Sequence, residues 1–449
     1  MPGVLRNMIG IHAFSHRSGK NQPCISREGG KLTACKSVFN MFSTVEHQPH
    51  SAKKRLVSNI YSKSYLQSSA QLHENSLILL RDRFLPFIQE AAIAQTVVDV
   101  HDMNNGFTTD FMSAYQFGLA CSTKLSVDPS AKHRYLRQYH SRKDYEFHSQ
   151  EIPRVKAWCK WLGFPLVPKQ IEEANDFMEE IGMRMCNNAD AYLENLPSAG
   201  MEPVVYKQFK NGLAKQRQRP GEKASQAEIE HQRLEVASEM LDHLSAGQET
   251  SAIALTYLYY EMSQRPDLQE QLRQELLSLS PQIVWPPTAG FELPSPKSID
   301  ALPLLHAIII ETLRLHAPIP GLEPRITPAG GCSLAGYDNI PAKVRVSAMP
   351  YALHRNAEVY PEPESWRPER WLKASEMEMK EMLRWFWAFG SGGRMCIGSN
   401  LAMQEMKLIV TAVYTNWRTV IVNEEGIEEI DAYTTRPRSN KLILRFEHV

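Results

Sequence analysis

The chain has 449 residues, of which 43% are hydrophobic and 22% are charged, and this composition supports a large buried core. Its 50 basic and 50 acidic residues cancel, and the lack of a dominant basic tract argues against a nucleic-acid partner. Seven widely spaced cysteines without a Cys-x-x-Cys pair argue against a disulfide framework or a zinc module. No run of 18 or more apolar residues occurs, so we expect no transmembrane anchor in this chain.

The first half of the chain predicts helices separated by loops. Residues 1–36 are rich in Gly, Ser and basic residues and lack periodicity, so we expect them to be poorly ordered. Several helices punctuated by prolines are expected between residues 130 and 220. The earlier helices are expected at residues 50–58, 66–91 and 99–120.

The second half combines long helices with short strands. The longest helix is expected at residues 222–263, followed by Pro266, and a strand pattern with a hairpin signal at 336–339 occupies 325–349. The other expected elements are helices at 267–278, 302–316 and 398–417, a loop at 281–300, an irregular stretch at 355–395 and a terminal hairpin at 430–449. The pattern therefore predicts a mainly α fold with a small β portion.

A glycine-rich loop near the C-terminus carries the strongest chemical signal. Residues 389–398 read FGSGGRMCIG and precede an apolar helical pattern. We expect Cys396 to lie at a helix N-terminus, where free N–H groups and the helix dipole favour a thiolate that can hold and tune an iron. The glycines allow positive φ and close approach to a flat macrocycle, and Arg394 can point at a carboxylate of that ligand. The alternative is a buried structural cysteine beside a turn.

Two charged residues in the expected 302–316 helix predict a structural ion pair. Glu311 and Arg314 are three residues apart, so their side chains lie on one helix face. If the pair is buried, the carboxylate needs a further partner, which Arg370 in the downstream WRPERW segment can supply. A solvated helical ion pair is the alternative.

The longest expected helix contains a sequence that can open a polar notch. Gly247 costs about 1 kcal/mol relative to Ala in a helix interior. The Thr250 hydroxyl can bond the Ala246 carbonyl and bend the helix, while Glu249 places an acid beside the notch. An oxygen-activating centre needs such a space, a hydroxyl and a route for protons.

These three motifs resemble those of the cytochrome P450 family. The resemblance implies a P450 fold in which the I, K and L helices surround haem b, with Cys396 as the axial ligand of the iron. It implies a structural triad of Glu311, Arg314 and Arg370, and oxygen activation by Thr250 and Glu249. The further residues expected to bind the cofactor are Arg394, Phe389, Gly392, Gly398, Arg325 and Lys54.

The resemblance also implies the reaction and its partners. A haem-thiolate monooxygenase inserts one oxygen atom of O2 into an apolar small molecule, with electrons from NADPH through a separate NADPH–cytochrome P450 reductase. The sequence around residues 354–356 and 368–371 is similar to that of microsomal enzymes of filamentous fungi. By analogy, this implies secondary-metabolite biosynthesis on the cytoplasmic side, at the surface of the endoplasmic reticulum.

Two parts of the sequence depart from the family pattern. The resemblance covers residues 41–449 as one haem domain, whereas residues 1–40 are unmatched and the N-terminal strands of the family are not found. The second hypothesis is therefore a catalytically inactive, N-terminally shortened haem-binding relic, and a zinc-binding structural protein is the third. The basic segment 53–55 replaces the family's usual haem-anchoring sequence, so His50, Lys54 and Arg55 remain alternatives for that role.

Overall fold

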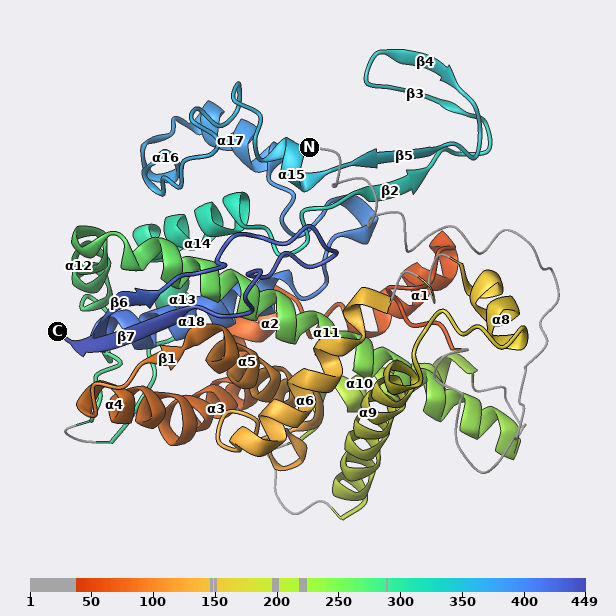
Figure 1. Ribbon diagram of the computed structural model, residues 1–449, viewed down its shortest axis with the longest axis horizontal. Coiled ribbons are helices and arrows are strands. Elements are labelled where there is room, and N and C mark those ends of the chain that lie inside the picture. The colour runs from red at the N-terminus through yellow and green to blue at the C-terminus, as the bar shows by residue number, and fades with distance from the viewer. Residues whose placement is uncertain (1–37, 146–147, 149–151, 196–201, 218–223, 288–289) are drawn as a thin grey trace.

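A long central helix organises the protein. The computed structural model describes residues 38–145, 148, 152–195, 202–217, 224–287 and 290–449. Helix α11 (Gln226–Ser263) crosses its middle and packs against α5 (Val100–Phe117) and α14 (Pro303–Leu315) (Figure 1). Because other elements cover α5 on every side, it is buried along nearly its whole length.

Helices form most of the described structure. The others are α1 (His47–Val57), α2 (Lys63–Ser68), α3 (Ala70–Leu79), α4 (Leu85–Ile93), α6 (Pro129–Ser141), α8 (Pro153–Trp161), α9 (Lys169–Asn195), α10 (Val204–Arg217), α12 (Pro266–Leu276), α13 (Pro296–Asp300), α15 (Pro350–Leu353), α16 (Glu369–Lys373), α17 (Glu376–Trp385) and α18 (Ser399–Asn416). Within the described ranges, every helix is too short or too polar to cross a lipid bilayer.

The strands form three small antiparallel groups. One sheet has the order β1 (Val98–Asp99), β7 (Ile443–His448), β6 (Trp417–Asn423). The other two groups are the pairs β2 (Glu323–Ile326) with β5 (Arg345–Ala348), and β3 (Cys332–Leu334) with β4 (Tyr337–Ile340). These two pairs project from the helical body (Figure 1). The prediction of a mainly α fold with a small β portion is confirmed.

Two predicted helical boundaries are wrong for local reasons. The single helix expected at 66–91 is interrupted at Ser69, whose extended backbone and hydroxyl, which accepts from the Leu72 N–H, start a new helix. A π-helical turn at Leu80–Phe84 then precedes Pro86, which has no N–H to continue the hydrogen-bond ladder. The expected loop at 281–300 also contains α13, which begins at Pro296 after a Ser295 cap.

The terminal hairpin expected at 430–449 is also wrong. Strand β7 pairs with β6, in a register that places Trp417 opposite His448, so the partner lies before residue 430. Within 430–449 and its flank, Glu429 and Pro437 form only an isolated bridge. The predictions for residues 1–36, and for the start of the helix at 222–223, lie outside the described residues.

Candidate active site

The cysteine loop is closed by backbone hydrogen bonds. The Cys396 N–H donates to the Phe389 carbonyl at 2.8 Å, which joins the two ends of the loop. Gly392 takes φ of +69°, a conformation that side chains disfavour. Gly398 is the N-cap of α18, and the N–H groups of Gly398 and Ser399 donate to the Cys396 sulfur. The sulfur therefore lies at a helix N-terminus, held by two backbone donors.

The Cys396 thiol is accessible and yet desolvated. Its side chain is exposed, yet burial is the main cause that raises the pKa of the thiol. Both observations hold when the accessible surface opens onto an internal space. The two N–H donors and the charge of Lys54 oppose the rise without reversing it, so the helix N-terminus does not by itself produce a thiolate. A bound metal cation would do so, because coordination deprotonates a thiol.

Three cations lie around the same loop. Lys54 from α1 donates to the carbonyls of Gly393 and Met395, at 3.2 and 2.8 Å. Arg394 donates to the carbonyls of Thr44 and Val45 just before α1, and Arg325 on β2 donates to the Ser391 carbonyl at 3.2 Å.

The other basic residues of α1 point elsewhere. Lys53 pairs with Glu235 at 2.6 Å and Arg55 bonds Ser51 at the surface. His50 is buried, and burial together with the charges of Arg394 and Lys54 lowers its pKa to about 4. Within the segment 53–55, only Lys54 therefore contacts the cysteine loop as a cation.

These residues fit a haem. Burial lowers the pKa of both Lys54 and Arg394, and neighbouring positive charge lowers it further. In the part of the chain that the structure describes, the hydrogen bonds of both side chains go to main-chain carbonyls and not to carboxylates. A ligand with two carboxylates would balance this charge, while its iron would meet the accessible sulfur.

A stripe of α11 carries the residues of the third expected motif. Ala246 is exposed in the middle of the helix, and the Thr250 hydroxyl donates to the Ala246 carbonyl at 2.6 Å. Gly247 lies on another face, where a Cβ would come within 2.6 Å of the Met112 sulfur on α5. The glycine thus permits close packing of α5 and α11, while Ala246 and Thr250 keep accessible surface.

Glu249 points away from this stripe. Its carboxylate accepts from Lys143 at 2.7 Å, from the Tyr139 hydroxyl at 3.0 Å and from the Thr434 hydroxyl at 3.1 Å. Burial alone would raise the pKa of Glu249, but the charge and hydrogen bond of Lys143 hold it below its usual value. Glu249 is therefore an ionised group that joins α11 to α6 and to the C-terminal segment.

The expected structural triad is assembled between α14 and the segment around residue 370 that precedes the cysteine loop. Arg314 donates to both carboxylate oxygens of Glu311, at 2.9 and 2.8 Å, and Arg370 donates to one of them at 3.0 Å. The Arg367 N–H and the Trp371 indole add two further donors to the fully buried carboxylate. The carboxylate thus fixes the segment that leads to Cys396 onto α14.

His354 connects this network to the start of the cysteine loop. One ring nitrogen, Nδ1, lies 2.9 Å from the Arg314 carbonyl and must donate to it, while Nε2 accepts from the Trp387 N–H at 2.8 Å. Protonation would place an N–H against another N–H. Burial is the main cause that lowers the pKa of His354, to about 3. His354 is a structural residue in its neutral form.

We expect the free energy of unfolding to fall as the pH drops from about 6.5 towards 3. In this window the unfolded chain binds a proton at residue 354 and the folded chain does not, because the folded pKa is about 3. The cost is about 1.4 kcal/mol per pH unit and per proton. Urea unfolding at several pH values should give a His354→Gln variant that is less stable at pH 7 but loses stability less steeply in acid. An exposed control, His47→Gln, should keep the wild-type slope; equal slopes in all three proteins would contradict the role.

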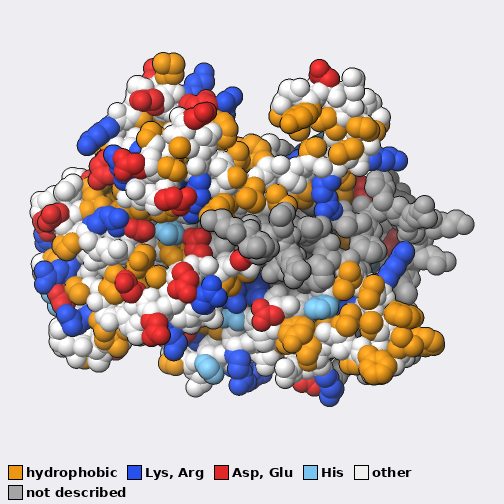
Figure 2. Space-filling model, turned by 45° about the horizontal axis from the view of Figure 1, so that its top comes forward, with side chains coloured by type: hydrophobic (Ala, Val, Ile, Leu, Met, Phe, Trp, Pro, Cys, Tyr) orange, Lys and Arg blue, Asp and Glu red, His pale blue; other side chains and the backbone are white. Residues whose placement is uncertain are grey.

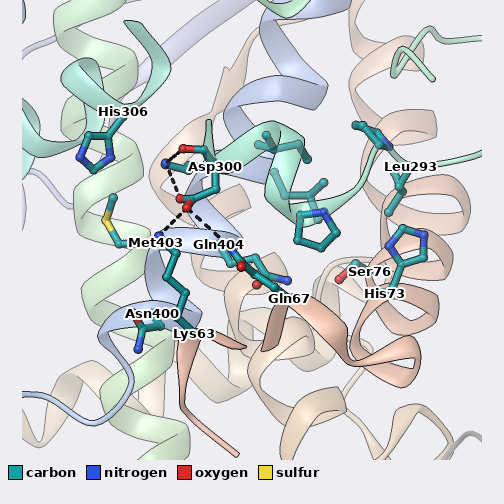
Figure 3. Close-up of a pocket in the computed structure, with 15 residues that line it drawn as sticks. Lys63, Gln67, His73, Ser76, Leu293, Asp300, His306, Asn400, Met403 and Gln404 are labelled. Atoms are coloured by element: carbon teal, nitrogen blue, oxygen red, sulfur yellow. Dashed lines mark hydrogen bonds and ion pairs between the residues drawn. The ribbon is translucent and has the colours of Figure 1, made fainter. Parts of the chain in front are cut away.

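A separate cavity lies on the outer side of α18. It has a volume of about 200 Å³, and Lys407 is part of its wall. Lys63, Asp300 and His306 also line it (Figure 3). Asp300 from α13 binds Lys407 at 2.7 Å and Lys63 at 2.6 Å. Neither Cys396 nor Thr250 lines this cavity, so it is separate from the cysteine loop and from the Thr250 stripe.

Comparisons with known proteins bear on the family of the chain. The family model described as Cytochrome P450 matches residues 46–444. The chain is 30% identical to the cytochrome P450 monooxygenase avaI of Aspergillus versicolor over 377 residues, which cover 81% of this chain and 80% of that protein. It is 27% identical to the cytochrome P450 monooxygenase FGM1 of Gibberella zeae over 415 residues, which cover 91% of this chain and 76% of that protein.

A solved structure supports the same architecture. The crystal structure of a cytochrome P450, CYP102L1, has a TM-score of 0.68 and 18% sequence identity, and the match covers 91% of this chain and 81% of that chain. At this identity the likeness shows the fold alone.

Proposed function

The chain belongs to the cytochrome P450 family of haem-thiolate monooxygenases, and on that premise we propose that Cys396 is the axial ligand of its haem iron. The observation that carries the proposal is an accessible thiol at the N-terminus of α18, in a loop that Lys54, Arg394 and Arg325 contact or flank. Such an enzyme couples RH, O2, two electrons and two protons to ROH and water. The relatives are monooxygenases, which favours an active enzyme over an inactive relic.

We assign the remaining site residues by their positions. When bound, the haem supplies the iron at which dioxygen is reduced. Lys54, Arg394 and Arg325 orient its carboxylates, and Phe389, Gly392 and Gly398 shape the loop that presents the sulfur. The Thr250 hydroxyl would hold a proton next to the reacting oxygen. Glu249, whose carboxylate points away from Thr250 towards Lys143 and Tyr139, would relay protons from that outer side of α11.

The cofactor, the electron donor and the pathway follow the family resemblance. We propose haem b as the cofactor and NADPH–cytochrome P450 reductase as the redox partner, with an apolar small molecule as the substrate. Relatives from Aspergillus versicolor and Gibberella zeae support a place in fungal secondary metabolism.

We also propose that the enzyme works at the surface of the endoplasmic reticulum. Apolar side chains of and after α8 are exposed, with Trp161 at 79% and Phe164 at 77%. Hydrophobic side chains gather at this end of the molecule and on the projecting β3–β4 hairpin (Figure 2). Such an exposed patch is typical of a contact with lipid or with another protein.

The decisive experiment combines a spectrum with turnover. The purified, reduced protein should give the red-shifted Soret band of a thiolate-ligated haem on addition of CO. Reconstituted with the reductase and NADPH, it should oxidise members of a panel of terpenes, polyketides and indole alkaloids that shift its spin state. A thiolate band without any turnover would favour the relic, and the lack of the band would refute the assignment of Cys396.

Thr250→Ala should uncouple electron transfer from product formation. Without the hydroxyl, protons reach the reduced oxygen in the wrong order, and oxygen leaves as hydrogen peroxide. We expect NADPH consumption to continue while the product formed per NADPH falls about tenfold or more, within the range for a lost proton-transfer group. Thr250→Ser keeps the hydroxyl and serves as the control. Unchanged coupling in Thr250→Ala would show that this residue does not steer protons.

A further inference from the structure

Three side chains of the kind that bind metals share one face of α11. Asp242 and His243 follow Glu239 by three and four residues, so the three side chains lie on the same side of the helix. One oxygen or nitrogen atom of each lies within 4.8 Å of the corresponding atoms of the other two. Glu239 and His243 are buried, and Asp242 is half-buried. Two carboxylates and one imidazole are thus brought together inside the protein.

The atoms that face one another in this cluster have no hydrogen-bond partner. His243 Nε2 and Glu239 Oε1 are both buried and lie 3.4 Å apart, but they do not form a hydrogen bond. Among the residues that the structure describes, none donates a hydrogen bond to Asp242, and no lysine or arginine pairs with any of the three side chains. Unpaired polar atoms are costly in a buried position, so these atoms point to a ligand that binds to them together.

The remaining polar atoms of Glu239 and His243 are held by other parts of the chain. The Tyr61 hydroxyl, between α1 and α2, lies 3.0 Å from His243 Nδ1, and the Met41 N–H donates to Glu239 Oε2 at 2.9 Å. Histidines that bind a metal use their second ring nitrogen in this way, and metal-bound carboxylates are likewise hydrogen-bonded. The two contacts therefore leave Nε2 and Oε1 as the atoms available to a metal.

The charge of the cluster fits a divalent cation. Burial, and then the charge of Glu239, raises the pKa of Asp242 to about 7. Two neighbouring groups are neutral, because burial lowers the pKa of His50 to about 4 and raises that of Tyr61. Burial lowers the pKa of His243, but Glu239 and Asp242 raise it above its usual value, so a proton there is one way to oppose the two carboxylates. A cation of charge two balances both carboxylates and leaves the imidazole neutral.

We propose that Glu239, Asp242 and His243 bind one divalent transition-metal ion, with Zn²⁺ as the best fit. Zn²⁺ binds imidazole nitrogen and carboxylate oxygen at about 2.0–2.2 Å, which sets its tetrahedral ligand atoms about 3–3.5 Å apart. His243 Nε2 and Glu239 Oε1 already have this separation, at 3.4 Å. The Asp242 side chain completes the set by rotating towards them, and a water molecule takes the fourth position. Mg²⁺ and Ca²⁺ fit less well, because they prefer oxygen ligands alone.

The role of this ion is structural and goes beyond the proposed function. Through Glu239 and Met41 it fixes the segment before α1 onto α11, and through His243 and Tyr61 it fixes the connection between α1 and α2. The Ser238 hydroxyl, which donates to the Val38 carbonyl at 2.9 Å, joins the same segment to α11. The ion would therefore stabilise the packing of the N-terminal part of the described chain.

Titration with the metal alone tests the site on the haem-loaded protein without a purification tag. After dialysis against a chelator, calorimetry with ZnCl2 should show one ion bound per chain, with a dissociation constant in the micromolar range or below. An excess of MgCl2 should not compete. The midpoint of thermal unfolding should rise with the Zn²⁺ concentration, because the ion binds the folded chain. A wild-type protein that binds no Zn²⁺ at micromolar concentrations would overturn the inference.

Variants separate this site from an adventitious ion. Asp242→Asn and His243→Gln should each weaken Zn²⁺ binding by more than about tenfold, and Tyr61→Phe, which acts through His243, by about tenfold. His231→Gln removes an exposed histidine from the same helix and should bind Zn²⁺ as the wild type does.

Asp242→Asn keeps the shape of the side chain, so it decides the question even if His243→Gln does not fold. Zn²⁺ binding that is equally tight in Asp242→Asn and the wild type would show an adventitious ion only and would overturn the inference. The reduced CO spectrum of each variant reports haem binding separately, so a loss of Zn²⁺ binding is not confused with a loss of haem.

Discussion

Cys396→Ser should abolish monooxygenation, with at least about a hundredfold loss of turnover. Residues that hydrogen-bond the ligands of a metal already change metal affinity or activity by about 10- to 100-fold, and a direct ligand contributes more. A serine hydroxyl stays protonated and cannot donate electron density as a thiolate does. We expect Lys54, Arg394 and Arg325 to retain part of the haem through its carboxylates, so that the variant is coloured but inactive. The measurements are haem content, the reduced CO spectrum and product formation with the reductase.

A second free cysteine supplies the matched control. Cys332 lies on β3, away from the loop, so Cys332→Ser should keep the wild-type spectrum and activity. If Cys396→Ser kept both the thiolate band and the oxidising activity, another residue would have to hold the iron. If Cys396→Ser lost activity but kept the thiolate band, Cys396 would be needed for activity without being the ligand of the iron.

The motifs that the sequence could reveal are local ones. Cys396 lies within three residues of the N–H groups of Gly398 and Ser399 that donate to its sulfur, so a short stretch of sequence is enough to predict these hydrogen bonds. Glu311 and Arg314 are one helical turn apart for the same reason. Predicting helix types succeeded where apolar periodicity was long, as in α11 and α18, because the pattern repeats over several turns.

The contacts that the sequence could not reveal join distant segments. Glu249 meets Lys143, 106 residues away, and Thr434, 185 residues away, and neither partner carries a local signal. Trp371 donates to Glu311 across 60 residues, although its place beside Arg370 could have suggested a second donor. Gly247 looked like an opening in the helix, but the neighbour on that face is Met112 of α5, which only the packing decides. Pairing of β6 with β7 was missed because the terminal segment also fits a local hairpin.

Glu311→Ala should unfold the cysteine loop and cost about 3–5 kcal/mol of stability. Arg314 is fully buried, and its guanidinium also donates to the carbonyls of His354, Pro363 and Ser365. Removing Glu311 leaves this buried charge uncompensated, which is the costly case for a buried ion pair. The Arg367 N–H and the Trp371 indole lose their acceptor at the same time. Urea unfolding and the fraction of haem incorporated during expression measure the effect.

An exposed Glu–Arg pair shows how much of the effect of Glu311→Ala depends on burial. Glu381 binds Arg384 on α17 with both side chains exposed, so Glu381→Ala should change stability far less than Glu311→Ala does. Glu311→Gln keeps the shape and should fall between the two, because a neutral amide still accepts from Arg314 but does not balance its charge. Since the carboxylate anchors the chain that leads to Cys396, the haem content should fall in the same order as stability. Full haem loading in Glu311→Ala would show that α14 does not hold the loop in place through this residue.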